Sequence, residues 1–332
     1  MKRLSLGVLV SLVLGLAALP LAAENALNSN RATRVITRSS PSADVRAPQL
    51  EPKATAAAYS AQVNIVTRVQ GTSFFRTAID ITNNTDVDTV VAQVQYCYTL
   101  NGTYVGCTPT TDIPLLNLDN FHQDDIVQYL GTLGVLQPGA EDLSFGTLLV
   151  TFQNLPSNFG WEGTVTARTY SPYNQADPNL GTVAIAYPGS LFFESANTTL
   201  VATIRDTRPA PTAAGALRTN LGLTNTDLNG AGAVNVQLSF YDVTPGTPTN
   251  GFRVGNFINV NNIQPGEVRQ TNDVFTAAAI PDNVLSVIAF ADVTSPSTGF
   301  PTIEGYANIL DGGTQDGAYF EMKCADTDLC GN

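Results

Sequence analysis

The sequence predicts an all-β protein: two tandem antiparallel β-sandwich domains that follow a signal peptide and a flexible N-terminal tail. Three observations support this prediction. From Tyr59 onward, apolar and polar residues alternate with a period of two, which is typical of half-buried strands. Clusters of Gly, Pro and Asn separate the alternating runs, as turns between strands require. One strand pattern recurs 142 positions later, which indicates that the chain repeats a folding unit.

The first 23 residues have the layout of a secretory signal peptide. Lys2 and Arg3 form a basic start, and an apolar run from Leu4 to Leu19 follows it. We expect cleavage after Ala23, because small residues stand there. The alternative is a membrane anchor, but this run is shorter than the roughly 20 apolar residues that span a bilayer. The mature chain is therefore predicted to be exported to the periplasm, the cell surface or the extracellular space, with no membrane span.

Residues 24–58 are predicted to be a flexible tail or linker, because they lack periodicity and contain three prolines. They carry five Lys or Arg against three Asp or Glu, whereas the chain from residue 59 onward carries nine against 25. The stretch from Arg31 to Arg38 is a candidate short strand, and its alternative is a solvated arm. If it adds to a neighbouring molecule, the tail supports self-assembly.

The internal repeat is clearest in one strand of each half. Arg76-Thr-Ala-Ile-Asp-Ile-Thr-Asn83 matches Arg218-Thr-Asn-Leu-Gly-Leu-Thr-Asn225. Two copies of one Arg favour a shared structural role, in which it bonds carbonyls at a strand end, over a ligand-binding role. The repeat predicts domains at 59–194 and 195–323 and a closing tail at 324–332. The repeated structural residues are Arg76, Thr77, Asn83, Arg218, Thr219 and Asn225.

A resemblance to a known group follows from this motif. The Arg-Thr-x-aliphatic-x-aliphatic-x-Asn strand resembles one in exported bacterial proteins with tandem immunoglobulin-like β-sandwiches. The element from Gly305 to Asp311 resembles a late strand and turn of the same group. The resemblance spans about residues 59–323 and implies that each half is an immunoglobulin-like antiparallel β-sandwich. It implies no activity and no catalytic residues.

Four cysteines predict two local disulfides. Cys97 and Cys107 flank Asn101-Gly102, a strong turn signal. A turn centred on Gly102 places the two cysteines opposite each other, within reach of a disulfide, and by the same count places Leu100 opposite Tyr104.

The second predicted disulfide joins Cys324 to Cys330 and closes the C-terminal tail. Export favours both bridges. The alternative is a four-thiolate metal site, which would need two distant pairs to converge and lacks the usual Cys-x-x-Cys spacing.

Two candidate ligand sites emerge from the sequence. Tyr96 and Tyr98 share one strand face and, with Tyr104, form a candidate platform for stacking on sugar rings, against ordinary sheet packing. Asp311 and Asp316 lie in an oxygen-rich turn, a candidate calcium site, although Asp and Gly also form turns without any metal. No other cofactor is predicted.

Composition and motifs argue against several functions. The chain has 16 Lys+Arg against 28 Asp+Glu and a formal charge of −12, which argues against nucleic acid. Its one histidine, His122, stands near Asp125, and because Asp125 recurs as Asp273 we expect a structural aspartate. The chain has no Gly-x-Ser-x-Gly elbow, and carboxylates such as Glu162 and Glu304 form no recognisable pair. We therefore predict no catalytic residues and no enzymatic activity.

The sequence thus predicts an exported, non-catalytic structural or interaction module of the cell surface or extracellular space. It would act through β-sandwich faces, loops or edges on a protein or polysaccharide surface. The alternative is a carbohydrate-binding module, calcium-stabilised, which would use the three tyrosines or Trp161.

Overall fold

The described part of the protein is built mostly of antiparallel β-strands. The computed structural model describes residues 57–70, 74–156, 162–172, 182–191, 199–207, 216–228, 232–295, 303–312 and 317–325. All of them belong to the second of the two units into which the chain divides, Pro52–Asn332. The predicted signal peptide and nearly all of the predicted tail lie outside the described residues.

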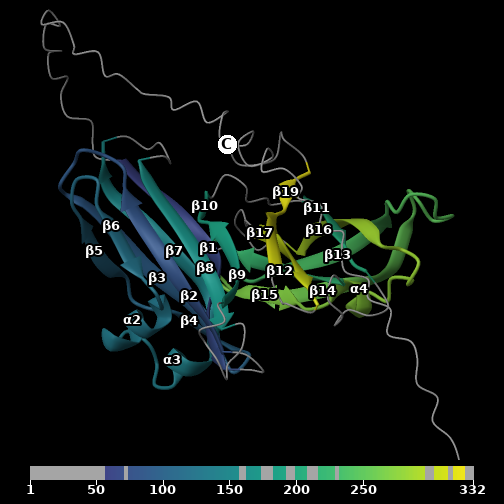
Figure 1. Cartoon of the computed structure of the whole chain (residues 1–332), viewed down its shortest axis with the longest axis horizontal. Coiled ribbons are helices and arrows are strands. Elements are labelled where there is room, and N and C mark those ends of the chain that lie inside the picture. The colour runs from purple at the N-terminus through teal and green to yellow at the C-terminus, as the bar shows by residue number, and fades with distance from the viewer. Residues whose placement is uncertain are drawn as a thin grey trace, which may run out of the picture. The chain divides into compact units, whose positions relative to one another are not determined.

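The first half of this unit contains strands β1 to β10 and two short helices (Figure 1). In chain order the elements are β1 (Ala57–Gln70), β2 (Phe74–Asn83), β3 (Val90–Leu100), β4 (Thr103–Cys107), β5 (Thr111–Leu115), β6 (Asn120–Gln123), α2 (Ile126–Thr132), α3 (Ala140–Leu143), β7 (Ser144–Leu155), β8 (Gly163–Pro172), β9 (Thr182–Pro188) and β10 (Ser190–Leu191). Their pairing order is β4-β3-β7-β1-β2-β8-β9, and β5, β6 and β10 pair with β3, β2 and β1.

The long strand β1 connects two groups of strands in the first half. Most of its length pairs with β7, whereas its last three residues, from Arg68 to Gln70, pair with the start of β2. Side chains from both groups meet in one core, where Tyr96 and Leu148 of the first group join Ile79 of the second. The result is a sandwich-like arrangement held by a single hydrophobic core.

The second half contains two separate sheets. Its elements are β11 (Thr199–Arg205), β12 (Leu217–Asn225), β13 (Val234–Asp242), β14 (Arg253–Ile263), β15 (Val268–Thr271), α4 (Val274–Ala277), β16 (Ser286–Ser295), β17 (Ile303–Asp311), β18 (Gly317–Glu321) and β19 (Lys323–Cys324). One sheet has the order β14-β13-β16-β11-β19, and the other has the order β15-β12-β17-β18. A core around Leu238, Phe240 and Phe275 fills the space between them.

The strand pairing of the first half recurs in the second. The pairs β3–β7–β1 correspond to β13–β16–β11, and β6–β2–β8–β9 correspond to β15–β12–β17–β18. The short strand β10 pairs with β1 as β19 pairs with β11. Both halves therefore share one order of strands, as a repeat found in the sequence would produce.

Buried polar contacts fasten the two halves together. Gln62 donates from Nε2 to Glu304 Oε2 over 3.2 Å, and Asn64 donates from Nδ2 to the Tyr319 hydroxyl over 3.2 Å. Thr224 donates in turn to Asn64 Oδ1 over 3.2 Å. Because strand β1 supplies two of these side chains, the first strand of the unit contacts its last strands.

A close approach at Gly266 belongs to the same junction. This residue has a φ of +77°, and a Cβ built on it would lie 2.6 Å from Sγ of Cys97. Its carbonyl accepts a hydrogen bond from Thr147 Oγ1 over 2.9 Å. Only glycine combines this backbone conformation with the space left by the first half.

Candidate functional site

A cleft of about 690 Å³ lies between the two halves, and we call it the inter-half cleft. One wall comes from strands of the first half, and it combines apolar side chains such as Ile65, Phe145 and Ile185 with the threonines Thr67, Thr99 and Thr169. The other wall comes from β12, β15 and β17 of the second half. Small-molecule sites favour such volumes and such positions between packed units.

The second wall is polar because strands β12 and β17 each direct one face into the core of the second half and place polar side chains of the other face along the cleft. Along β12, Leu221 points into the core of the second half, whereas Arg218 and Asn220 line the cleft. Along β17, Asn308 and Leu310 line the cleft in the same way, and Asn308 is the cross-strand partner of Asn220. The alternation of a strand thus places three polar side chains next to each other.

Some polar groups of this second wall have hydrogen-bond partners, and one of them has none among the described residues. Asn220 accepts a hydrogen bond at Oδ1 from the Asp273 backbone N–H over 3.0 Å. Glu267, which is buried, accepts from Arg269 Nε over 2.7 Å. Asn308 is only 4% exposed, and among the described residues its Oδ1 has no hydrogen-bond partner. A buried acceptor of this kind is costly unless something else donates to it.

Sequence reasoning missed this cleft and two of its residues, Asn220 and Asn308. Both stand at alternate positions of strands, a pattern that indicates a solvated face. The face is instead covered by the first half, so both strands are buried along nearly their whole length. Only the packing of the first half against these strands distinguishes a covered face from a solvated one, and this packing is not visible in the local sequence.

The repeated Asn residues hold the loops that follow their strands. Asn83 Nδ2 donates to the carbonyls of Val87 and Leu116, both over 2.8 Å. Asn225 Nδ2 donates to the carbonyls of Gly232 and Ile263, both over 3.0 Å. Both Asn side chains are buried, and each Oδ1 accepts a backbone N–H two residues on. Asn83 and Asn225 therefore have the same structural role, which is to hold the loop that follows the strand.

The repeated Thr residues tie neighbouring strands together. Thr77 Oγ1 accepts from the Thr67 backbone N–H over 2.9 Å, and Thr219 Oγ1 donates to the Arg205 carbonyl. In each half the bond joins the second strand of the unit to its first, β2 to β1 and β12 to β11.

The predicted bonding of the repeated Arg to strand-end carbonyls is not seen at Arg76. Arg76 places its guanidinium over the ring of Tyr170, 4.8 Å from the centroid. Among the described residues no hydrogen bond from Arg76 to a strand-end carbonyl is found, so stacking replaces the expected bonds. Arg218 lines the inter-half cleft.

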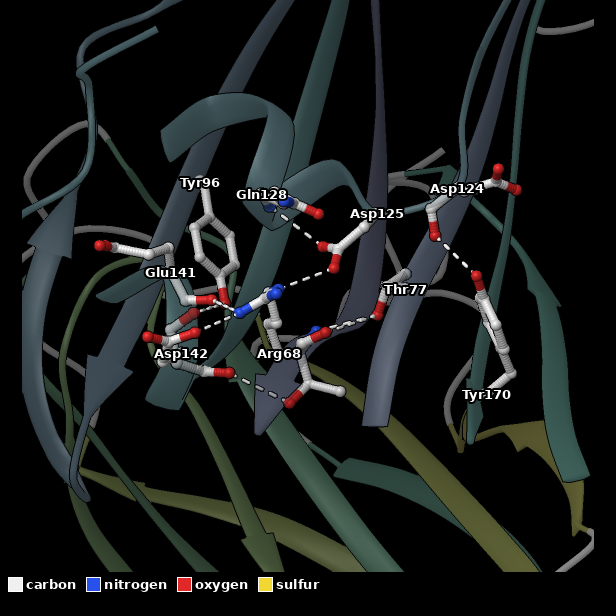
Figure 2. A network of polar contacts seen from close by, with 11 residues as sticks. Arg68, Thr77, Tyr96, Asp124, Asp125, Gln128, Glu141, Asp142 and Tyr170 are labelled. Atoms are coloured by element: carbon white, nitrogen blue, oxygen red, sulfur yellow. Dashed lines mark hydrogen bonds and ion pairs between the residues drawn. The ribbon is translucent and has the colours of Figure 1, made fainter. Parts of the chain in front are cut away.

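A polar network around Arg68 anchors both helices of the first half (Figure 2). Arg68 Nε pairs with Asp125 Oδ2 over 2.8 Å, and its Nη1 contacts the Glu141 carbonyl and the Asp142 carboxylate. The other oxygen of Asp125 accepts the Gln128 backbone N–H over 3.0 Å and so caps α2. This carboxylate therefore stabilises the fold.

Asp273, the counterpart of Asp125 in the repeat, caps the helix of the second half. It accepts the Thr276 backbone N–H over 3.2 Å at the start of α4. The two aspartates thus share the structural role that the repeat predicts.

His122 lies between two carboxylates on the surface. Its Nδ1 is 2.9 Å from Asp80 Oδ1 and its Nε2 is 3.2 Å from Asp124 Oδ1, so its neighbours are not the Asp125 that the sequence indicated. Hydrogen bonds to these two carboxylates raise the pKa of the His122 imidazole. The side chain is 51% exposed, in a shallow depression that Arg168 and Tyr170 also line. The arrangement is an exposed charge cluster.

The predicted tyrosine platform is not a surface. Tyr96 and Tyr98 are 0% and 3% exposed and stack on each other with centroids 5.0 Å apart. Tyr96 donates to the Val66 carbonyl over 3.0 Å, and burial raises the pKa of its hydroxyl. Tyr104 donates to the Pro265 carbonyl at the junction of the halves. Sugar rings cannot stack on side chains packed in this way, so ordinary sheet packing, the alternative, describes them.

The disulfide between Cys97 and Cys107 is confirmed. The predicted register near the turn was wrong, because Leu100 pairs with Thr103 rather than with Tyr104. Asn101 and Gly102 both have positive φ and form a two-residue turn. A bulge next to Tyr98 then adds the residue that brings the two cysteines opposite each other.

Several other predicted residues fall at the edge of the described regions or beyond it. Cys324 ends β19, and Cys330 lies outside the described residues, so the second disulfide stays a prediction. Asp311 ends β17, and Asp316 and Trp161 lie outside the described residues as well. Within the described ranges, no group of three or more His, Cys, Asp or Glu side chains is placed to hold a metal ion.

A group of exposed and half-buried aromatic side chains lies on strands β13, β14 and β16 of the second half, and we call it the aromatic face. It consists of Tyr241, Phe257 and Phe290, with Arg253 between them. Tyr241 and Phe290 meet edge to face with centroids 5.4 Å apart. Arg253, the cross-strand partner of Tyr241, lies over the Phe257 ring at 4.3 Å. Phe257 is 46% exposed, so the group faces solvent.

Comparisons with known proteins give distant likenesses. No family model and no curated protein matches the chain. A Streptomyces avermitilis α-L-rhamnosidase solved with L-rhamnose is 13% identical, with a TM-score of 0.20, over 76% of this chain and 26% of that chain. A Pleurotus ostreatus lectin in its apo form is 9% identical, with a TM-score of 0.14, over 84% of this chain and 91% of that chain. Such TM-scores carry no argument about function.

None of the helices in the described regions is long and apolar enough to cross a membrane.

Proposed function

We propose that this protein is an exported, non-catalytic interaction module of the cell surface or extracellular space, built from two immunoglobulin-like β-sandwiches. The observation that carries the proposal is the aromatic face. Solvent-facing positions of a strand are usually polar, whereas here Tyr241, Phe257 and Phe290 gather on one side of a sheet. Clustered exposed aromatic side chains mark interaction surfaces, because they gain most when a partner removes them from water.

The surroundings of the aromatic face suit a partner with both apolar and polar groups. A shallow depression of about 370 Å³ on this face is lined by Tyr241 and Phe290 together with Ser239 and Asp292. Phe252, the most exposed aromatic among those described in this half, lies at the end of the same sheet at 68% exposure. Rings flanked by hydroxyl and carboxylate groups can contact a protein surface or a polysaccharide.

Carbohydrate binding is the second candidate function, and the same face favours it. Aromatic rings stack on the apolar faces of sugar rings, while neighbouring Ser and Asp oxygens bond the sugar hydroxyls. This location replaces the tyrosines of the first half, of which Tyr96 and Tyr98 are buried and Tyr104 donates to the Pro265 carbonyl. Calcium support at Asp311 and Asp316 remains part of this candidate.

Retention on insoluble polysaccharides, with and without calcium, separates the two candidates. Tyr241→Ala with Phe257→Ala should abolish retention, and Phe320→Ala, which removes an exposed aromatic ring from strand β18, should leave it unchanged. Retention that survives the double substitution would move the binding site elsewhere. No retention on any polysaccharide, combined with capture of a protein partner that the double substitution abolishes, would favour the protein-binding candidate.

The proposal also includes self-assembly through the basic tail, since the body of the chain is acidic and attracts it. Sedimentation velocity of residues 24–332 beside residues 52–332 tests this part. We expect larger species only with the tail present, and more of them at low salt. Monomers from both chains would contradict tail-driven assembly.

A further inference from the structure

We infer that the aromatic face of one copy of this chain binds a loop of the next copy, so that copies associate head to tail. The loop consists of residues 116–119, and we call it the leucine loop. The inference rests on the proposed function, because it names the partner of the aromatic face. A second loop, residues 264–267, makes an equivalent contact within one chain, and we call it the junction loop.

The two loops have the same backbone geometry. The leucine loop joins β5 to β6, and the junction loop joins β14 to β15. The third residue has a positive φ in both loops, +54° at Leu118 and +77° at Gly266. The carboxylate of the fourth residue, Asp119 or Glu267, accepts the backbone N–H of the first residue, over 3.3 Å and 2.8 Å respectively. The carbonyl of the fourth residue accepts the backbone N–H of the repeated asparagine, over 2.9 Å and 3.1 Å. The loops are therefore equivalent parts of the repeat.

The junction loop docks on one face of a sheet in the first half. Gly266 packs so closely on Cys97 that a Cβ built on the glycine would lie 2.6 Å from Sγ. Its carbonyl accepts from Thr147 Oγ1 over 2.9 Å. The neighbouring Pro265 carbonyl accepts from the Tyr104 hydroxyl. Cys97 and Thr147 are cross-strand partners on β3 and β7, and they are 1% and 3% exposed. A loop of this geometry can therefore cover the outer face of such a strand pair.

The aromatic face is the second-half counterpart of the face that the junction loop covers. At the repeat offset of 142 positions, Ser239 of β13 corresponds to Cys97. Phe290 of β16 is the cross-strand partner of Ser239. Thr147 of β7 has the same place beside Cys97. Ser239 and Phe290 line the depression of about 370 Å³, so the position that is covered in the first half is open in the second.

The neighbouring strand shows the same correspondence. Tyr241 corresponds to Thr99 at the offset of 142 positions. The cross-strand partner of Thr99 is Tyr104, which donates to the junction loop. The cross-strand partner of Tyr241 is Arg253, whose side chain is exposed. Arg253 therefore stands where a donor to an incoming loop belongs, and a guanidinium supplies several N–H donors.

The side chains of the leucine loop complement the open face. Leu118 stands where the junction loop has Gly266. Leu116 and Leu118 are 62% and 71% exposed, the highest values for large apolar side chains in the described part of the first half. The sulfur of Cys97 leaves no room for a side chain opposite Gly266. The depression beside Ser239 leaves that room on the aromatic face, and leucine gains free energy when it moves from water onto such rings.

The leucine loop is held in its shape before any partner arrives. A positive φ is unfavourable for a bulky residue such as Leu118. Its backbone N–H donates to the Thr85 carbonyl over 3.1 Å, and the Asn117 N–H donates to Asp88 Oδ1 over 3.1 Å. Strained backbone of this kind persists where the surrounding structure fixes it, and it clusters at binding sites. A loop that is already ordered loses little conformational entropy on docking.

The charges of the loop and the face are opposite. Asp119 belongs to the leucine loop, and Asp88 lies beside it through its bond to Asn117. Docking brings both carboxylates toward the exposed guanidinium of Arg253. Such pairs fix the register of a contact and speed its formation more than they add affinity.

One chain carries both surfaces, so the contact is heterologous. Each added copy leaves one leucine loop free at one end and one aromatic face free at the other. Association therefore continues as a linear series of copies rather than stopping at a symmetric dimer.

The first test is sedimentation velocity of residues 24–332 over a range of concentrations, in about 1 M salt, where screening removes attraction by the basic tail. We expect a series of larger species. Leu118→Asn should weaken association about tenfold or more, because the apolar contact is lost. Asparagine tolerates a positive φ, so the loop keeps its shape. Leu133→Asn, at another exposed leucine of the first half, is the control and should leave association unchanged. Association that survives Leu118→Asn would overturn the inference.

Mixing two blocked variants tests the direction of the contact. Leu118→Asn keeps an intact aromatic face, and Tyr241→Ala with Phe257→Ala keeps an intact leucine loop. Each variant alone should be monomeric, and an equal mixture should form a dimer of one copy of each and nothing larger. A mixture that stays monomeric would overturn head-to-tail binding.

Failure of this inference differs from failure of the proposed function. If the unaltered chain does not associate in about 1 M salt, the head-to-tail contact is overturned. Retention on a polysaccharide, or capture of a foreign protein, that requires Tyr241 and Phe257 would then still support the aromatic face as an interaction surface.

Discussion

The two halves share one strand order but differ in what they add to it. Asn83 and Asn225 hold equivalent loops, and Asp125 and Asp273 cap equivalent helices. The first half adds a disulfide and the ion pairs of Arg68, whereas the second half adds the aromatic face. The difference teaches that the repeated residues maintain the architecture, and that the residues which differ are the ones to test for function.

The largest expected effects come from the repeated asparagines. Asn83→Ala removes four side-chain hydrogen bonds and Asn225→Ala removes three, and each substitution leaves two loop carbonyls without their donor. Each should lower the free energy of unfolding by about 3 kcal/mol, measured by urea denaturation. Asn259→Ala, at an exposed position of β14, is the control and should change stability little. A large loss of stability in only one of the two Asn variants would show that Asn83 and Asn225 are equivalent in position but not in their contribution to stability.

The next effect belongs to the first half alone. Replacing Cys97 and Cys107 by Ala opens a loop of 10 residues and should cost about 2.5 kcal/mol of stability. Ser239→Ala changes the corresponding position of the second half and should cost much less. Thermal denaturation of the two variants makes the comparison. Equal losses would mean that the disulfide contributes little beyond ordinary packing.

Arg68 and Arg205 occupy matching strands and sharpen the comparison further. Arg68→Met leaves the buried Asp125 carboxylate without its cation and should cost about 2 kcal/mol, less than for a fully buried pair because Arg68 is partly exposed. Arg205 is exposed, and Arg205→Met should cost less than about 0.5 kcal/mol. Urea denaturation at neutral pH measures both. Similar losses of unfolding free energy in the two variants would show that the ion pairs of Arg68 contribute no more to stability than an exposed arginine does.

The smallest effect is the pH dependence that His122 gives to the first half. Its folded pKa is raised by Asp80 and Asp124, so the stabilisation is fully present below the unfolded pKa, near 6.5. It is lost as pH rises through the folded pKa. The melting temperature of the wild type should therefore fall slightly relative to His122→Gln between pH 5.5 and pH 8.5, since exposed pairs contribute little. If the melting temperatures of the two proteins change equally with pH, the pH dependence does not come from His122.

Much of the fold could be predicted from the sequence, because local rules determine it. Period-two alternation located the strands, and Asn101-Gly102 located a hairpin that a disulfide closes. The repeat that begins at Arg76 and at Arg218 anticipated the shared strand order. These features depend on neighbours within one strand or one turn.

The sites could not be predicted, because they depend on what covers each face. Alternation places Tyr96 and Tyr98 on one face but does not say that this face is the core. Asn220 and Asn308 look like solvated positions until the first half is packed against them. The bulge beside Tyr98 likewise shifts the register without any local signal in a two-residue turn.

The contacts between β1 and the last strands have a consequence for how the molecule is completed. Gln62 and Glu304 are 242 residues apart, and Asn64 and Tyr319 are 255 residues apart. Synthesis delivers the chain from its N-terminus, so the first half can fold while its partners have not yet been made. During that interval water must satisfy Gln62 and Asn64, and the final strands displace this water as they arrive. A chain that stops short of Glu304 would keep a hydrated surface where the finished protein has a sealed one, and a protease could recognise the unfinished product by that difference.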